Sequence, residues 1–321
     1  MTVRAVPDVL VATPARIYAR KPPFRTCFME LQPRENRSIR LSMVRTWQPV
    51  RPEESPRLSD ARLQLHHAAQ FCSAVGISFL EEQSDDSHSN LEWIPALGGL
   101  FSRAVPARTS FRLGIRPADL ALVIVTQNDQ PFAQYKLHGR TIVEATQWIR
   151  THIAAFGLDS ARYTLKRHFD IPVHPVDDGD AFDASDKSRF EELSKWLANA
   201  AALLGSVARS IHEASEVRCW PHHFDIAIVI RATPNRTIGV GFEPGDESYD
   251  EPYFYVNMRP QPSAVQAKSK PLWGRGAWHT RGWVGAVLTG SRIGAASEQE
   301  RHAREFIDSA ISACRGMITQ N

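Results

Sequence analysis

The feature that most constrains the fold is an alternation of side chains that begins at position 224. Residues 224–231 carry a bulky apolar side chain at every second position, residues 233–236 form a turn, and residues 237–242 return. A third such stretch, 253–258, follows a polar loop. A period of two places successive side chains on opposite faces of a strand, and short turns join antiparallel strands. Residues 224–258 therefore predict an antiparallel meander.

A second meander and several helices are predicted elsewhere in the chain. Residues 111–137 contain three strand-like runs separated by turns. Thr141 and Glu144 have the spacing of a capping box, in which their side chains satisfy two backbone N–H groups at the start of a helix. Apolar residues at steps of three and four predict helices, at 59–75, 141–157, 190–211 and 298–317.

Groups of antiparallel strands with helices between them predict an α+β fold. Its antiparallel sheet or sheets would have helices packed on one face. The meander-plus-helix pattern occurs twice, so the domain predicted for residues 58–321 allows two similar halves, 58–183 and 184–321.

The first 57 residues differ in composition from the rest of the chain. Residues 1–57 are rich in Arg and Pro and show no sustained apolar period, which predicts a poorly ordered N-terminal extension. Met43 is an alternative start, so whether residues 1–42 belong to the native protein stays open.

Composition narrows the classes of protein to consider. Of the 321 residues, 43% are hydrophobic and 23% charged, as in soluble globular proteins, and the net charge of +3 is too small to predict nucleic-acid binding. No apolar run reaches the roughly 18 residues of a membrane span. The four cysteines are scattered without a C-x-x-C pair, so neither a zinc site nor a disulfide framework is indicated. We expect a cytoplasmic protein that binds neither nucleic acid nor membrane.

Polar residues that could act on a ligand gather at the ends of the meander at 224–258. If residue 224 faces the core, His223 and Asp225 share the opposite face of the strand. An Asp beside a His can set the tautomer of the ring and raise its basicity, as a general base or a metal ligand requires. The candidate catalytic residues are His223, Asp225, Asp246 and His279.

Aromatic and further polar residues surround these four in the sequence. Aromatic side chains with polar tips commonly line small-molecule pockets. Crowded carboxylates need cations, so convergence with histidines would give an N/O site suited to manganese, iron or zinc, although metal and cofactor both stay open. The candidate ligand-binding residues are Trp220, His222, Glu243, Tyr249, Asp250, Tyr253, Tyr255, Trp278 and Trp283.

Simpler interpretations compete with a functional site. His222 and His223 could hydrogen-bond only to backbone at the start of a strand, and the acidic loop could be a hydrated connection. His66 and His67, in the first helix, are predicted to lie on a half-exposed surface. The aspartates at 177–180 lack the ligand spacing of a calcium loop and are predicted to be solvated.

Three motifs resemble a bacterial domain family of unknown function. W-P-H-H-F-D begins at Trp220, P-G-D-x-x-Y-D-E-P-Y-F-Y at Pro244, and W-H-T-x-G-W-x-G-A-V-L at Trp278. The resemblance covers roughly residues 58–311. It departs in the first helix and at 88–93, where the family has an Asn-His-Trp-Trp-like cluster of which the chain keeps a His and a Trp. The family brings no known activity, so the resemblance points to a site and leaves its chemistry open.

Two classes of function are therefore expected. In the first, the protein holds a small molecule in a pocket floored by the meander and walled by 278–283, as a binding protein or as an enzyme that uses acid–base chemistry. In the second, the protein is a structural or protein-interaction module whose acidic loop is a solvated rim. The oligomeric state is not predicted.

Overall fold

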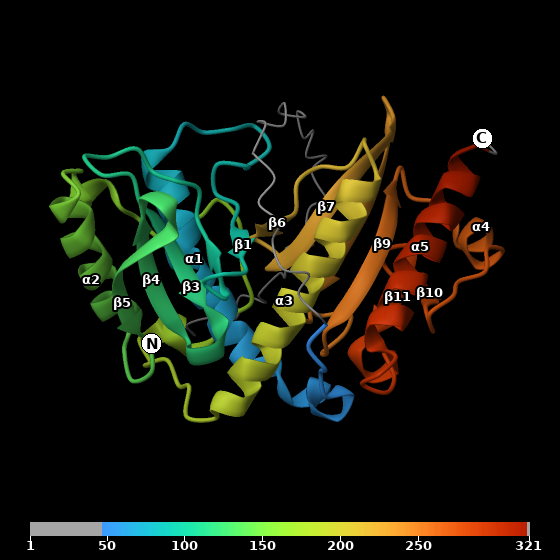
Figure 1. The fold of residues 1–321 in the computed structure, drawn as a ribbon, viewed down its shortest axis with the longest axis horizontal. Helices are drawn as coiled ribbons and strands as arrows, with labels where there is room; N and C mark the ends of the chain where they lie inside the picture. The colour runs from blue at the N-terminus through green and yellow to red at the C-terminus, as the bar shows by residue number, and fades with distance from the viewer. Residues whose placement is uncertain (1–46, 320–321) are drawn as a thin grey trace, which may run out of the picture.

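The computed structural model describes residues 47–319 and shows two antiparallel sheets with helices around them (Figure 1). This is the α+β fold that the alternating segments predicted. The smaller sheet has five strands in sequence order. They are β1 (Glu92–Ile94), β2 (Gly99–Phe101), β3 (Arg112–Arg116), β4 (Ala121–Thr126) and β5 (Gln130–Lys136).

The larger sheet has six strands and contains the meander predicted at 224–258. Its strand order is β10-β11-β9-β8-β7-β6, so β9 pairs with β11 and β10 forms an edge. The strands are β6 (Arg218–Trp220), β7 (Asp225–Thr233), β8 (Arg236–Glu243), β9 (Tyr253–Arg259), β10 (Ala277–His279) and β11 (Gly285–Thr289).

Four of the five α-helices begin and end close to the predicted positions, and the short α4 was not predicted. The predicted capping box is present: the Thr141 hydroxyl accepts from the Glu144 N–H, and the Glu144 carboxylate accepts from the Thr141 N–H. The α-helices are α1 (Ser59–Phe79), α2 (Ile142–Ala155), α3 (Lys187–Ser210), α4 (Ala264–Lys268) and α5 (Gln299–Ile318).

One face of the six-stranded sheet forms the core with α3 and α5. Ile226, Ile228 and Ile230 of β7 are almost fully buried on this face, and both helices contact the sheet and lie in front of it in Figure 1. α1 connects this core to the five-stranded sheet, because it contacts both β3 and α3. Sixteen of its 21 residues are buried, so α1 is a central helix.

The described part of the predicted N-terminal extension, residues 47–57, is packed against α3 and α5. The Asn199 side-chain amide accepts from the Gln48 N–H at 2.9 Å and donates to its C=O at 2.7 Å. Gln299 binds the N–H and C=O of Val50 in the same way, at 3.0 and 2.8 Å. These two side chains satisfy the backbone as a neighbouring strand would, which the polar composition of the segment did not predict. Residues 1–46 lie outside the described residues.

Replacing Gln299 by Ala tests this attachment. The substitution leaves the buried N–H and C=O of Val50 without partners, and we expect it to lower the free energy of unfolding by about 3 kcal/mol. Glu300→Ala, at an exposed neighbour on the same helix, is the control and should have a small effect. Chemical denaturation of both variants measures the difference. Equal stabilities would show that residues 47–57 contribute little to the fold.

Candidate functional site

The second face of the six-stranded sheet carries most of the predicted site residues. Asp225, Glu243, Tyr253 and Tyr255 project from β7, β8 and β9 on the side away from the buried isoleucines. Gly241 lies between Ala227 of β7 and Tyr255 of β9 in the register. A Cβ atom at Gly241 would lie 2.4 Å from the Tyr255 hydroxyl, so this glycine lets the phenol ring cross β8.

The crossing ring brings Tyr255 to Asp225. The Tyr255 hydroxyl donates to Oδ2 of Asp225 at 2.5 Å. Asp225 is 6% exposed, and its second oxygen, Oδ1, has no hydrogen-bond partner among the described residues. Burial raises the pKa of the Asp225 carboxyl, while the Tyr255 hydrogen bond opposes the rise. Burial also raises the pKa of Tyr255 well above its usual value, so this phenol stays a donor.

Asp246 organises the loop between β8 and β9. Its Oδ1 accepts from the backbone N–H groups of Ser248 and Tyr249, at 2.7 and 3.0 Å. Its Oδ2 accepts from the Tyr253 hydroxyl at 3.1 Å. Burial raises the pKa of Tyr253, and the carboxylates of Glu243 and Asp246 add to the rise. The contacts of Asp246 are those of a carboxylate that holds a loop.

His279 pairs with a third tyrosine on the same face. Its Nε2 lies 2.6 Å from the carbonyl oxygen of Arg281, which can only accept, so Nε2 carries the proton. The Tyr249 hydroxyl then donates to Nδ1 at 2.8 Å. Trp283 stacks on the imidazole with ring centroids 4.4 Å apart. Both nitrogens of His279 are therefore engaged within the protein.

The three tyrosines form one row across the sheet. Ring centroids are 5.0 Å apart between Tyr249 and Tyr253, and 6.3 Å apart between Tyr253 and Tyr255. The row begins at Asp225 and ends at His279, so the predicted polar and aromatic residues share one face without meeting at one point.

The prediction that residues 278–283 form a wall of the site is wrong for Trp278. Trp278 is opposite Ala286 in the register, which places its side chain on the core face, and its indole N–H donates to the Lys270 carbonyl at 2.9 Å. His279, the next residue, is opposite Gly285 and faces the tyrosine row. The period of two along β10 separates the two neighbours.

The strand position predicted for His223 is also wrong. β7 begins at Asp225, and His222 and His223 lie in the turn after Trp220. Phe224 ends the turn with φ of +65°, a left-handed conformation that interrupts the alternation and is uncommon for an aromatic residue. Its N–H donates to the Trp220 carbonyl at 2.7 Å.

Aromatic rings pack against one another in and beside this turn. Trp220 is 9% exposed, and the rings of His222 and His223 are 4.4 Å apart. Burial lowers the pKa of His222 to about 4, so its imidazole is neutral at pH 7.

Sequence reasoning missed the side chains of α1 that hold this turn. His66 and His67 are 5% and 3% exposed, which corrects the prediction of a half-exposed surface. His66 Nε2 lies 2.8 Å from the Pro221 carbonyl, and Gln70 Nε2 donates to the same oxygen at 2.9 Å. Arg62, one turn before His66, donates to Asp250 at 3.2 Å and so holds the β8–β9 loop.

A sequence signal for this contact existed. Arg62, His66 and Gln70 are spaced by four residues, so they share one face of the helix. Their stripe differs from the apolar stripe of Ala61, Leu65 and the residues that follow. A second stripe of polar residues on a helix that is buried elsewhere indicates a polar contact within the protein.

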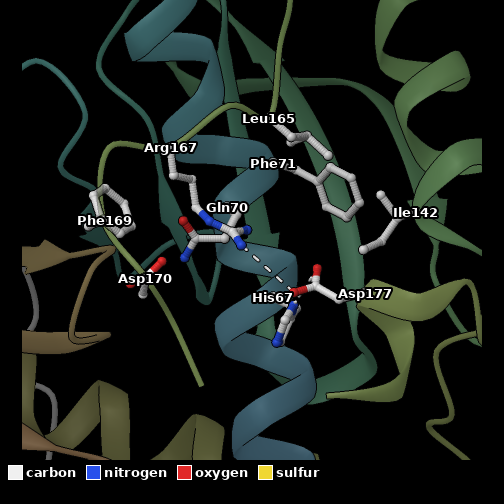
Figure 2. A pocket seen from close by; sticks show the side chains of 9 residues that line it. All are labelled: His67, Gln70, Phe71, Ile142, Leu165, Arg167, Phe169, Asp170 and Asp177. Carbon is white, nitrogen blue, oxygen red and sulfur yellow. Dashed lines mark ion pairs between the residues drawn. The ribbon is translucent and has the colours of Figure 1, made fainter. Parts of the chain in front are cut away.

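Searches for a metal site and for a membrane span gave no candidate. Within residues 47–319, no group of three or more His, Cys, Asp or Glu side chains is arranged to hold a metal ion. Within the same range, no helix combines the length and the apolar character needed to cross a membrane. A cavity of about 340 Å³ does occur, beside α1, and none of the predicted site residues lines it (Figure 2).

Comparison of the chain with protein-family models, with curated proteins and with solved structures finds no match. The resemblance to a bacterial domain family therefore stays a prediction.

The buried His66 predicts how stability changes with pH. Burial lowers the pKa of His66 to about 3, against an ordinary value of 6.5, so the folded protein keeps this ring neutral while the unfolded chain protonates it. The neutral His66 ring therefore makes its full contribution to the free energy of unfolding above pH 6.5, and this contribution is lost as the pH falls towards 3. We expect His66 alone to account for a loss of about 2 kcal/mol between pH 7 and pH 5.

His66→Gln keeps a donor for the Pro221 carbonyl and removes the titration. Urea denaturation at pH 7 and pH 5 should show a smaller loss of stability in this variant than in the wild type. His212→Gln, at an exposed histidine, is the matched control. An unchanged pH dependence in His66→Gln would contradict a buried neutral ring.

Proposed function

We propose that the protein binds a small polar molecule at Asp225 and Tyr255 and exchanges a proton with it. The observation that carries the proposal is the state of the Asp225 carboxyl. One oxygen is held by Tyr255 at 2.5 Å, and the other is buried without a partner among the described residues.

An unpaired buried acceptor is costly in a folded protein. Leaving such a group without a hydrogen bond costs about 1–3 kcal/mol, and more for a charged group. Proteins keep few groups of this kind, and a ligand that supplies the missing donor is one reason for their presence. An N–H or O–H group of a small molecule would satisfy Oδ1 of Asp225.

The environment of the carboxyl suits proton exchange. Burial raises the pKa of Asp225, a change that is common in carboxyls that act as general acids or bases, and the Tyr255 hydroxyl stabilises the ionised form. Asp225 would take or give the proton through Oδ1. Tyr255 would orient the carboxyl through Oδ2 and, with Gly241 beneath its ring, keep that geometry.

Neighbouring side chains would enclose the ligand. Trp220 is opposite Asp225 in the register and lies on the same face, and its ring is 6.2 Å from that of His222. The neutral His222 would offer a hydrogen-bonding ring without a competing charge. Glu243 and Tyr253 continue the polar face along β8 and β9. Tyr249 and His279, bonded to each other, would hold the far end of the tyrosine row.

Ligand-observed NMR with a panel of small polar metabolites tests the proposal. Compounds that bind the wild type should lose at least about tenfold in affinity in Asp225→Asn and in Tyr255→Phe. Tyr135→Phe removes a hydroxyl from the other sheet and serves as the control, with affinities unchanged. Thermal denaturation confirms that each variant is folded.

Gly241→Ala adds a test that leaves both polar residues in place. The new methyl group would displace the Tyr255 ring, so binding should weaken as it does in Tyr255→Phe. Compounds that bind the wild type and all of these variants equally would contradict a site at Asp225.

A further inference from the structure

The cavity beside α1 has the size of a small-molecule site. Its volume of about 340 Å³ falls within the roughly 300–1,000 Å³ of ligand pockets. One wall is α1, a second is the first residue of α2, and a third is the segment 165–177. The cavity borders the turn that leads to Asp225, because Gln70 of its lining bonds the Pro221 carbonyl and the Phe169 ring lies 5.7 Å from that of His222. Its lining residues do not include the residues of the proposed site.

The lining of the cavity is divided into an apolar and a polar part. Phe71, Ile142 and Leu165 lie together on one side in Figure 2. The residues on the other side are Gln70, Arg167, Phe169 and Asp170. A ligand that fills this space needs an apolar body and a polar head.

Gln70 is held firmly in the wall at the polar side. The residue is 3% exposed, and its Nε2 donates to the Pro221 and His66 carbonyls, at 2.9 and 3.0 Å. These bonds fix the orientation of the amide, so its oxygen cannot be exchanged for its nitrogen. Oε1 is buried and has no hydrogen-bond partner among the described residues. Because this oxygen is closed to solvent, Gln70 shapes the wall and leaves the recognition of charge to its neighbours.

Arg167 and Asp170 lie on the same side of the cavity as Gln70 and carry opposite charges. Arg167 has an ion-pair contact of 3.7 Å to Asp177, a distance too long for a hydrogen bond, so its donors remain available for a planar carboxylate. Asp170 is exposed and forms no ion pair within residues 47–319. Its carboxylate can accept from an ammonium group.

Asp177 is held in place as part of the wall. It lies 3.2 Å from Nδ1 of His67, whose Nε2 is 2.9 Å from the Pro172 carbonyl. The aspartates at 177–180 are exposed, as predicted for a solvated loop, and Asp177 in addition joins α1 to the segment that carries Arg167. Figure 2 shows the two ion pairs of Asp177 as dashed lines.

We propose that this cavity binds a free α-amino acid with an apolar side chain. The carboxylate of the ligand pairs with Arg167, and its ammonium group donates to Asp170. The apolar side chain packs against Phe71, Ile142 and Leu165. A zwitterion with adjacent charges matches the neighbouring positive and negative groups, whereas a ligand with a single charge leaves one of them unpaired.

Isothermal titration calorimetry on the whole chain tests the proposal with four probes. L-leucine should bind, and 4-methylpentanoate and 3-methylbutylamine, which lack its ammonium and its carboxylate, should each bind at least about tenfold more weakly. L-serine, which lacks the apolar side chain, should also bind at least about tenfold more weakly. If leucine gives no heat at about 10 mM, or if either single-charge analogue binds as tightly as leucine, the proposal is overturned.

Two pairs of variants locate the binding site. Arg167→Gln and Asp170→Asn should each weaken leucine binding at least about tenfold. Lys166→Gln and Asp178→Asn, which change neighbouring charges outside the cavity lining, should leave the affinity unchanged. Leucine binding that survives both cavity variants would place it elsewhere and overturn the proposal. Because these variants alter no residue of the Asp225 site, the result is independent of the function proposed there.

Discussion

The carbonyl oxygen of Pro221 is bonded by two side chains of α1, and the candidate site depends on this contact. His66 and Gln70 both reach it, which fixes the turn between β6 and β7 against the central helix. The His66 ring also stacks on Phe224, with centroids 5.3 Å apart. Phe224 is held in its left-handed conformation by this burial, and the strand that follows begins at Asp225.

The hydrogen bond that holds Asp225 then depends on Gly241, which has no side chain. Gly241 leaves room for Tyr255 to cross β8 and bond Oδ2, while Oδ1 is buried and has no hydrogen-bond partner within residues 47–319. The carboxyl is therefore buried, has a hydrogen bond to only one of its oxygens among the described residues, and has a raised pKa. This combination is more typical of a carboxyl in a functional site than of a structural one. Gln70 contacts both the turn and the cavity, because its Nε2 donates to the Pro221 carbonyl and its side chain lines the cavity.

The sequence predicted what depends on local period and spacing. Alternation placed Asp225 and Tyr255 on one sheet face, and the Thr141 capping box marked the start of α2. The positive φ of Phe224 could not be predicted, because it results from packing against a helix more than 150 positions earlier. The burial of His66 and Gln70 could not be predicted for the same reason, although their spacing of four residues from Arg62 indicated a shared polar face.

The central claim is that Asp225 is a buried carboxyl with a raised pKa and one oxygen that lacks a hydrogen-bond partner within residues 47–319. The most direct measurement is a pH titration of the side-chain carboxyl by carbon-13 NMR, assigned with Asp225→Asn. We expect the pKa of Asp225 to lie above the usual value of about 3.9, and to rise further in Tyr255→Phe, because the hydroxyl stabilises the charged form. A pKa at or below the usual value, or one unchanged in Tyr255→Phe, would contradict the account.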